Sequence, residues 1–292
     1  MCTTEIFCKV DDFCNDFIPQ FDSFLIGSGA KKRMRNKTMC LSERMLIMII
    51  FHQSDYRTFK KFYLEKICKY HKADFPNLLS YNRFVELMPE MLVPMTVFLY
   101  SQRGRCTGIS YIDSTSLAVC LKARAKRNKV FKDIAGWGKS SVDWFYGLKL
   151  HIIVNENGEL IAFCITSGNT DDRVPVRNMS KEIFGKLFGD KGYISEKLAT
   201  EMMNKNIQLF TTLRKNMKNR VMNVSDKILL RKRVIVETVN DQLKNISQIQ
   251  HTRHRSPFNC MLNILAGLAA YCFQDKKPSL NINRREMLPI LV

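Results

Sequence analysis

The sequence lacks the cysteine spacing that marks a disulfide framework or a zinc site. Its ten cysteines are scattered singly along 292 residues, and no two form a Cys-x-x-Cys pair. His251 and His254 lie three residues apart, but no cysteine pair lies near them. Because no secretory signal opens the chain, we expect reduced and mostly buried thiols rather than disulfides or structural zinc.

Long apolar runs are also missing. The most apolar stretches, Met45–Phe51 and Met261–Phe273, are shorter than the ~20 residues that cross a bilayer. No amphipathic anchor, internal repeat or low-complexity tract is visible. We therefore expect a soluble cytoplasmic protein with no membrane partner.

The sequence has far fewer acidic than basic residues. The chain has 46 Lys and Arg against 27 Asp and Glu, a formal net charge of +19. Counted along the sequence, residues 1–105 carry 16 basic and 11 acidic groups, and residues 106–292 carry 30 and 16. Such an excess attracts polyanions, so the second part is predicted to face nucleic acid.

Residues 1–105 are predicted to form an all-helical domain. Apolar residues recur at helical spacing in Ile6–Phe24, Leu41–Phe51, Tyr56–Tyr70 and Tyr81–Tyr100. Ser80 is the expected N-cap of the last stretch. A helix-turn-helix would place Asn82 and Arg83 at the exposed start of a DNA-recognition helix. A plain helical bundle with a solvated basic face explains the same pattern equally well.

Residues 106–292 are predicted to form an α/β domain. Strands are expected at Cys106–Ile112, Phe145–Val154, Leu160–Thr166, Lys186–Phe188 and Ile207–Leu213. Helices are expected at Val174–Phe184, Ser195–Asn204, Asp226–Lys244 and Cys260–Phe273. An Asn-Gly pair at 157–158 predicts a hairpin between the second and third strands. This order indicates a mixed sheet with flanking helices.

Basic residues gather in Lys122–Lys132, which we interpret as an exposed excursion from the sheet. Its candidate DNA-binding residues are Arg124, Lys126, Arg127 and Lys129.

Three acidic residues are the candidate catalytic and metal-binding groups. Asp113 is expected to end the first strand, Asp190 follows the fourth, and Glu237 lies among valines on a long helix. If the first and fourth strands are neighbours, their carboxyl ends bring the two aspartates together. Carboxylates suit Mg²⁺ or Mn²⁺, and two such ions catalyse phosphodiester chemistry. Each aspartate also fits a plain turn or N-cap role.

Two further aspartates compete for the second position. Asp171 and Asp172 follow Gly168-Asn-Thr170 and fit a loop and N-cap. We expect them to be structural or to support the site indirectly.

Five motifs together resemble the DDE (Asp-Asp-Glu) transposases of bacterial insertion sequences. They are Tyr111–Thr115, Trp144–Asn155, Ser167–Asp172, Gly189–Tyr193 and Val236–Lys244. Their order and content are most like the insertion sequence 982 family, within the insertion sequence 4 and 5 grouping, over about residues 41–273.

The resemblance implies a ribonuclease-H-like catalytic domain with two metal ions per active site. Asp113 would bridge both ions, and Asp190 and Glu237 would each complete one. Related transposases carry a Tyr-x2-Arg-x3-Glu-x6-Lys signature, which Arg233, Glu237 and Lys244 fit in spacing while Leu230 replaces the tyrosine. Arg233 and Lys244 are candidate phosphate contacts, or else part of a solvated helix face.

The implied activity is DNA cleavage and strand transfer at the ends of an insertion sequence. Double-stranded DNA, as element ends and as target, would be the partner, and a homodimer would assemble on two ends. The apolar helices Leu41–Phe51 and Cys260–Phe273 are candidates for its interface. The alternatives are a non-catalytic DNA-binding protein, such as a domesticated transposase or repressor, and a nuclease that cuts without joining.

Aromatic residues near the carboxylates add one more expectation. Trp137, Trp144 and Tyr193 could stack on an unpaired base at a strand end. Core packing is the simpler explanation for Trp144, which starts a strand.

Overall fold

The chain divides into two compact units. The computed structural model describes residues 1–30, 33, 38–140, 143–213, 222–251 and 253–282. The first unit comprises residues 1–102, 243–249 and 254–275, and the second comprises 103–242, 250–253 and 276–292. The first boundary lies three residues before the one expected after residue 105. Residues 254–275, expected in the second domain, instead belong to the first unit.

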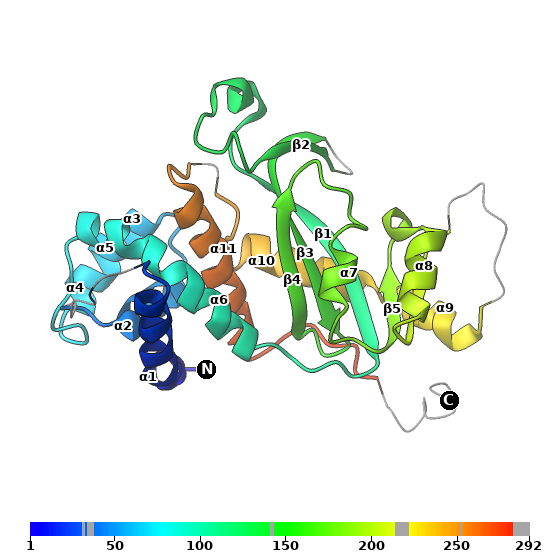
Figure 1. The fold of residues 1–292 in the computed structure, drawn as a ribbon, viewed down its shortest axis with the longest axis horizontal. Helices are drawn as coiled ribbons and strands as arrows, with labels where there is room; N and C mark the ends of the chain where they lie inside the picture. Colours follow the sequence, from blue (N-terminus) through cyan, green and yellow to red (C-terminus); the bar gives the residue numbers. More distant parts are fainter. Residues whose placement is uncertain (31–32, 34–37, 141–142, 214–221, 252, 283–292) are drawn as a thin grey trace. The chain divides into compact units, whose positions relative to one another are not determined.

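The first unit is helical (Figure 1). Its helices are α1 (Thr3–Gly27), α2 (Leu41–Phe51), α3 (Phe59–Lys61), the π-helix η1 (Phe62–Ile67), α4 (Cys68–Tyr70), α5 (Tyr81–Leu87), the 3₁₀ helix η2 (Met88–Met91), α6 (Leu92–Ser101) and α11 (Pro257–Cys272). The late helix α11 is buried over nearly its whole length, and it contacts α2, η2 and α6. A helix that is apolar all round needs partners on every side. The N-terminal helices supply those partners, so α11 joins them.

Local caps fix where these helices begin. Ser80 accepts a hydrogen bond from the backbone N–H of Arg83, as its position predicts. Before α2, the Cys40 thiol accepts from the N–H of Glu43, whose carboxylate accepts from the Cys40 N–H at 2.9 Å. This capping box was not anticipated, because cysteine rarely fills the N-cap position.

The predicted helix pair is held together by aromatic rings. Phe84 of α5 lies with its ring centroid 5.3 Å from that of Phe59 and 5.0 Å from that of Tyr63. Asn82 and Arg83 are exposed at the start of α5, and Arg83 pairs with Glu86 at 2.9 Å. Their exposure suits either a recognition helix or a solvated face, so DNA recognition by this helix stays a prediction.

One helical stretch in the described part of the chain is long and apolar enough to cross a membrane. It runs through Tyr81–Ser101, with a mean hydropathy of 1.2 in its most apolar window, and 44% of that window is buried inside the structure. The core helix of a soluble protein passes the same test. Burial of Phe84, Met91, Met95 and Phe98 in the first unit accounts for the apolar character.

The second unit is a mixed sheet with helices on both faces. Its strands are β1 (Ile109–Ala118), β2 (Gly136–Lys139), β3 (Trp144–Asn155), β4 (Leu160–Ser167), β5 (Gly185–Gly189) and β6 (Ile207–Thr211). The order is β2-β3-β1-β5-β6, and β4 also pairs with β3. Strand β3 is antiparallel to its three partners, whereas β1, β5 and β6 are parallel. The β3–β4 turn contains Gly158 at a φ of 69°, which confirms the predicted hairpin.

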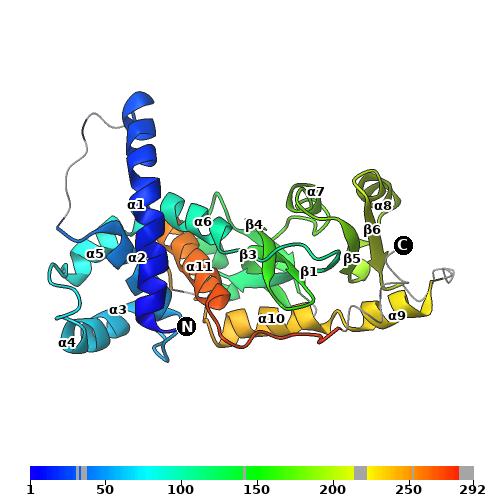
Figure 2. The same cartoon turned by 90° about the horizontal axis from the view of Figure 1, so that it is seen from below.

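Helices cover the sheet on two sides (Figure 2). Helices α7 (Val176–Met179) and α8 (Glu196–Met203) lie on one side. Helix α9 (Val224–Arg231) and the start of α10 (Val234–Asn245) lie on the other. The first side closes over a core that includes Ile112, Ile153 and Leu187. The predicted α/β class and mixed sheet are confirmed.

Three predicted elements differ from the structure. Strand β1 extends past Asp113 to Ala118, because it stays paired with β3 through that end. The expected helix Val174–Phe184 shrinks to the single turn of α7. The expected helix Asp226–Lys244 is two helices, which meet at residues 232–233. Strand β2 was not expected, since two of its four residues are glycine.

The thiols are less buried than expected. All ten cysteines are free. Three are buried, Cys14, Cys120 and Cys260, and the others are exposed or half-buried. Burial raises the pKa of Cys14 and of Cys260 to about 12, so these two act as small apolar groups.

Candidate active site

Asp113 and Asp190 lie at the same level of two neighbouring parallel strands. The β1–β5 pairing ends at Tyr111 opposite Phe188, and each aspartate follows two residues later. The predicted neighbour relation of the two strands is therefore confirmed. Asp113 does not end its strand, because β1 continues alongside β3 with Asp113 opposite Ile152. The strand thus holds the Asp113 backbone rigidly where β5 has already ended.

Asp190 begins a tight turn at the end of β5. Its Oδ1 accepts a hydrogen bond from the Gly192 N–H at 2.7 Å and caps the 3₁₀ turn η4 (Lys191–Tyr193). The preceding Gly189 lets the Tyr193 ring pack closely, because a Cβ there would lie 2.9 Å from that ring. The Gly-Asp-Lys-Gly-Tyr run therefore fixes the direction of the Asp190 side chain.

Helix α10 supplies the third carboxylate. Glu237 lies in its first turns and pairs with Arg233, with Nη1 2.9 Å from Oε1. Three residues on, on the same helix face, Asn240 donates a hydrogen bond from Nδ2 to Asp113 Oδ2 at 3.0 Å. Asn240 is buried, and its Oδ1 has no hydrogen-bond partner within the described residues. Sequence reasoning missed Asn240, although its i+3 spacing from Glu237 was a usable signal.

The three carboxylates interact electrostatically. Burial raises the pKa of Asp113 to about 6, and the negative charges of Asp190 and Glu237 add to that rise. The backbone N–H of Ser114 and the Asn240 amide oppose it. In the part of the chain that the structure describes, neither aspartate forms an ion pair. Three negatively charged groups therefore interact here, and among the described residues no side-chain cation pairs with either aspartate.

Carboxylate oxygens are the donors that Mg²⁺ and Mn²⁺ prefer, so the chemistry of this set fits a divalent cation. Within the described residues, however, no three His, Cys, Asp or Glu side chains stand close enough to hold a metal ion. Glu237 faces Arg233 instead. The types of donor atom therefore fit a metal site. In the described residues, however, the three carboxylates are not arranged as the ligands of one ion.

The competing aspartates have cationic partners. Arg173 donates from Nε to Asp171 Oδ1 at 2.8 Å and from Nη2 to Oδ2, and this contact lowers the pKa of Asp171 to about 2. Asp172 accepts from Lys149 Nζ at 2.9 Å, and its Oδ1 lies 3.9 Å from Nδ1 of the buried His151. Both carboxylates are neutralised by neighbours, as expected of structural residues.

The candidate DNA-binding residues lie in four places, of which the start of α5, with Asn82 and Arg83, is described above. Exposed on the segment after β1 are Arg124, Lys126, Arg127 and Lys129. Arg233 is half-buried beside Glu237. Lys244 lies in the last turn of α10, in the part that belongs to the first unit. The contact of these groups with DNA stays a prediction.

The three aromatic candidates behave differently. Trp137 is 42% exposed and Trp144 is 52% exposed, so Trp144 does not pack in the core. Tyr193 is 1% exposed, and burial, with the nearby charges of Asp113 and Asp172, raises its pKa well above the usual value. Tyr193 is therefore a packing residue under the site and is unavailable for stacking on a base.

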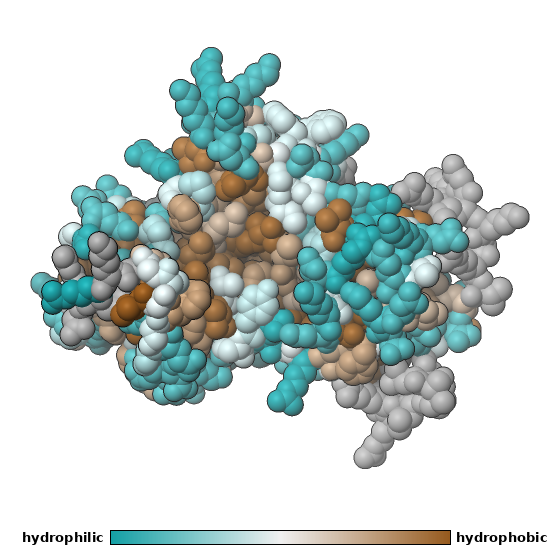
Figure 3. Space-filling model, viewed as in Figure 1, coloured by the Kyte–Doolittle hydropathy of each residue, from teal (hydrophilic) through white to brown (hydrophobic). Residues whose placement is uncertain are grey.

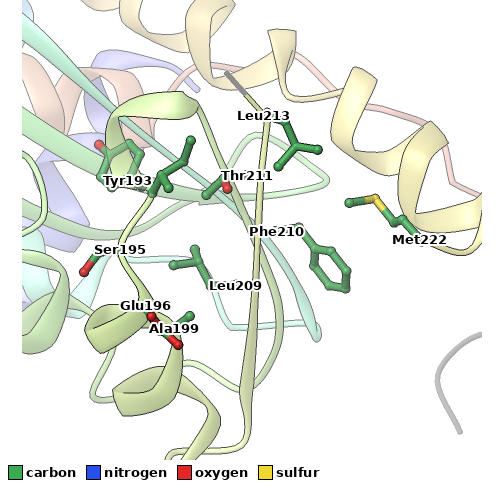
Figure 4. A pocket seen from close by; sticks show the side chains of 10 residues that line it. Tyr193, Ser195, Glu196, Ala199, Leu209, Phe210, Thr211, Leu213 and Met222 are labelled. Atoms are coloured by element: carbon green, nitrogen blue, oxygen red, sulfur yellow. The ribbon is translucent and has the colours of Figure 1, made fainter. Parts of the chain in front are cut away.

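A pocket lies next to the Asp190 turn (Figure 4). Residues from η4, α8 and the end of β6 line it, namely Tyr193, Ile194, Ser195, Glu196, Ala199, Leu209, Phe210, Thr211, Leu213 and Met222. It contains none of the three candidate carboxylates, and its wall is mainly apolar. The pocket is therefore not the carboxylate site itself.

Two aspartates at the same level of neighbouring strands, on a mixed sheet in a strongly basic protein, are the arrangement expected of an α/β domain that acts on phosphodiesters. A family model described as "Transposase DDE domain" matches residues 103–257, more than half of the chain. The chain belongs to this transposase domain family. The match does not distinguish the insertion sequence 982 family from its relatives, and a search of curated proteins finds no match.

Proposed function

We propose that this transposase cleaves and joins DNA at the ends of an insertion sequence, with Asp113, Asp190 and Glu237 as its catalytic carboxylates. The observation that carries the proposal is that the half-buried Asp113 lies beside two like charges, with no cation against either aspartate in the described residues. Buried carboxylates that lack a neutralising partner are costly to keep. Such a cost is typical of a functional site.

The three carboxylates would hold two Mg²⁺ or Mn²⁺ ions, in a domain of ribonuclease-H-like architecture. When bound, these ions supply Lewis-acid activation of the attacking oxygen and neutralise the leaving one. To serve as a ligand, Glu237 must exchange its contact with Arg233 for one toward Asp113. The released guanidinium is then free to hold a DNA phosphate beside the site, which is the role expected of it.

The chain's own groups position the reacting parts. The Asn240 amide holds Asp113, and the Gly192 N–H holds Asp190. In the first proposed step, water attacks a phosphodiester, the P–O3′ bond breaks and a 3′-hydroxyl is released. In the second step this hydroxyl attacks a target phosphodiester, whose own P–O3′ bond breaks. No protein side chain becomes covalently attached.

We propose that the active form is a homodimer on paired DNA ends, acting in the cytoplasm. One set of three carboxylates per chain provides one active site, and two ends have to be processed together. The apolar helices α2 and α11 do not form a free surface for this dimer, since both are buried in the first unit. Light scattering with and without paired ends tests the assembly, and a strand-transfer complex with one chain per DNA end pair would contradict it.

The activity is tested with labelled element-end DNA, target plasmid and Mg²⁺. Cleaved ends with a 3′-hydroxyl, followed by joined products, support the proposal. Cleavage without joining would indicate a nuclease, and end binding without cleavage would indicate a repressor-like protein. Metal binding is measured separately, as a Mg²⁺-dependent rise in thermal midpoint that Asp113→Asn reduces.

A further inference from the structure

The β2–β3 hairpin exposes both tryptophans of the chain. Trp137 lies in β2 and Trp144 begins β3. The Lys139 Nζ lies 6.0 Å from the centroid of the Trp144 ring, and the Trp137 ring lies 5.6 Å from that of Tyr146. Two large aromatic side chains this exposed on one hairpin indicate a surface that binds something.

These side chains project from one face of the hairpin. In the β2–β3 register Trp137 is opposite Tyr146, and Lys139 is opposite Trp144. Directly opposite residues share a face, as do residues two apart on one strand. Trp137, Lys139, Trp144 and Tyr146 therefore form a single aromatic and cationic surface, called here the hairpin face.

A basic segment is attached to this hairpin. The 3₁₀ helix η3 (Lys122–Arg127) follows β1, and Lys122 forms an ion pair with Asp143, the residue before β3. The segment projects beyond β2 (Figure 1), and its surface is hydrophilic (Figure 3). Its further exposed basic residues are Arg124, Lys126, Arg127, Lys129 and Lys132. Residues 119–143 contain two acidic residues, Asp133 and the Asp143 that pairs with Lys122. The net positive charge around the hairpin face therefore suits a polyanion.

The hairpin face lies on the same side of the sheet as Asp113. Asp113 is opposite Ile152, and Tyr146 and Trp144 precede Ile152 by six and eight residues on β3. An even separation returns a strand side chain to the same face. At ~3.3 Å per residue the hairpin face begins about 20 Å from the carboxylates. A DNA strand crossing the site can reach it.

We propose that the hairpin face binds unpaired bases of a DNA strand that extends from the active site. Bases would stack on Trp137 and Trp144, while Lys139 and the basic segment hold the phosphates. Aromatic side chains interleaved with cations are the combination that binds single strands without sequence preference. The inference rests on the proposed action on DNA, but its test requires no catalysis.

Tryptophan fluorescence tests this surface directly, because both tryptophans of the protein lie on it. The full-length protein, without metal, is titrated with a short oligothymidylate and with a duplex of the same length. We expect strong quenching by the single strand, weak quenching by the duplex, and affinity that falls steeply with salt. Equal quenching by both forms, or none by either, overturns the proposal.

Variants separate stacking from charge. Trp144→Ala should weaken single-strand binding about tenfold, with Trp137 still reporting, while Trp144→Phe retains most of the affinity. Lys139→Gln should lower the salt slope by about one. Phe184→Ala removes another exposed aromatic of the second unit and should change nothing. Unchanged binding by folded Trp144→Ala protein refutes the inference.

The two proposals fail separately. Single-strand binding on this face by a protein that never cleaves would sink only the catalytic proposal. Cleavage and joining at normal rates by Trp144→Ala, with unaltered single-strand affinity, would sink only this one.

Discussion

Asp113 and Asp171 lie in the same unit and show two opposite ways of placing a carboxylate. Asp171 is about half exposed and pairs bidentately with Arg173, which lowers its pKa to about 2. Asp113 is half-buried beside Asp190 and Glu237, and desolvation raises its pKa to about 6. Arg173 neutralises Asp171, whereas no side-chain cation pairs with Asp113 among the described residues. This difference separates the structural carboxylate from the catalytic candidate better than sequence position does.

The largest expected effect comes from replacing the three candidate catalytic carboxylates. We expect Asp113→Asn, Asp190→Asn and Glu237→Gln each to lower cleavage by roughly three orders of magnitude, because several kcal/mol of transition-state stabilisation are lost. Binding of element ends should persist. Single-turnover cleavage and gel-shift binding measure the two effects.

Asp171→Asn is the matched control for those variants. It makes the same chemical change at a carboxylate that Arg173 already neutralises, so cleavage should stay near wild type. An inactive Asp171→Asn together with an active Asp190→Asn would mean that the second carboxylate has been assigned to the wrong residue.

Asp226 offers a third case, a carboxylate both buried and paired. Its Oδ1 lies 2.7 Å from Lys186 Nζ and ties α9 to β5. We expect Asp226→Asn to lower the free energy of unfolding by about 3–5 kcal/mol, because it leaves the lysine buried without its carboxylate. Urea denaturation measures this loss. The double variant Asp226→Leu, Lys186→Met should recover much of this stability. A loss below ~1 kcal/mol in Asp226→Asn would mean that the ion pair is exposed to solvent.

Local pattern is what made the placement of Asp113 and Asp190 on neighbouring strands predictable. Apolar runs ending in Asp113 and Asp190 mark strands whatever surrounds them, and parallel neighbours bring their ends together. Ser80 and Ser195 cap helices through contacts within three residues. Such features depend on short stretches of chain, so the sequence carries them.

The features that escaped prediction depend on long-range contacts. The Asn240–Asp113 hydrogen bond joins residues 127 positions apart. Helix α11 joins the first unit through contacts with α2 and α6. The break between α9 and α10 falls at Lys232 and Arg233, residues of good helix propensity, so composition does not reveal it. Each of these is decided by what another part of the fold presents.

Asn240 sharpens the comparison, because it supports Asp113 without neutralising it. We expect Asn240→Ala to lower cleavage about 10–100-fold and to raise the Mg²⁺ concentration needed, as loss of a group that orients a metal ligand does. Asn240→Gln should recover part of both. Thr238→Ala, an exposed change on the same helix, is the control. A reduced rate with an unchanged Mg²⁺ requirement would mean that Asn240 serves the fold alone.

The smallest effect is expected at Asp171 itself, as a dependence of stability on pH. A carboxylate whose pKa is lowered on folding stabilises the protein above its unfolded pKa, and that contribution is lost as the pH falls toward the folded value. For Asp171 the window runs from the ordinary pKa of 3.8 down to about 2. Because solvent screens this half-exposed pair, Asp171→Asn should lower the free energy of unfolding by at most ~1 kcal/mol at pH 7. The difference from wild type should vanish near pH 2, and a difference that stays constant from pH 7 to pH 2 would show that the Arg173 pair contributes nothing to it.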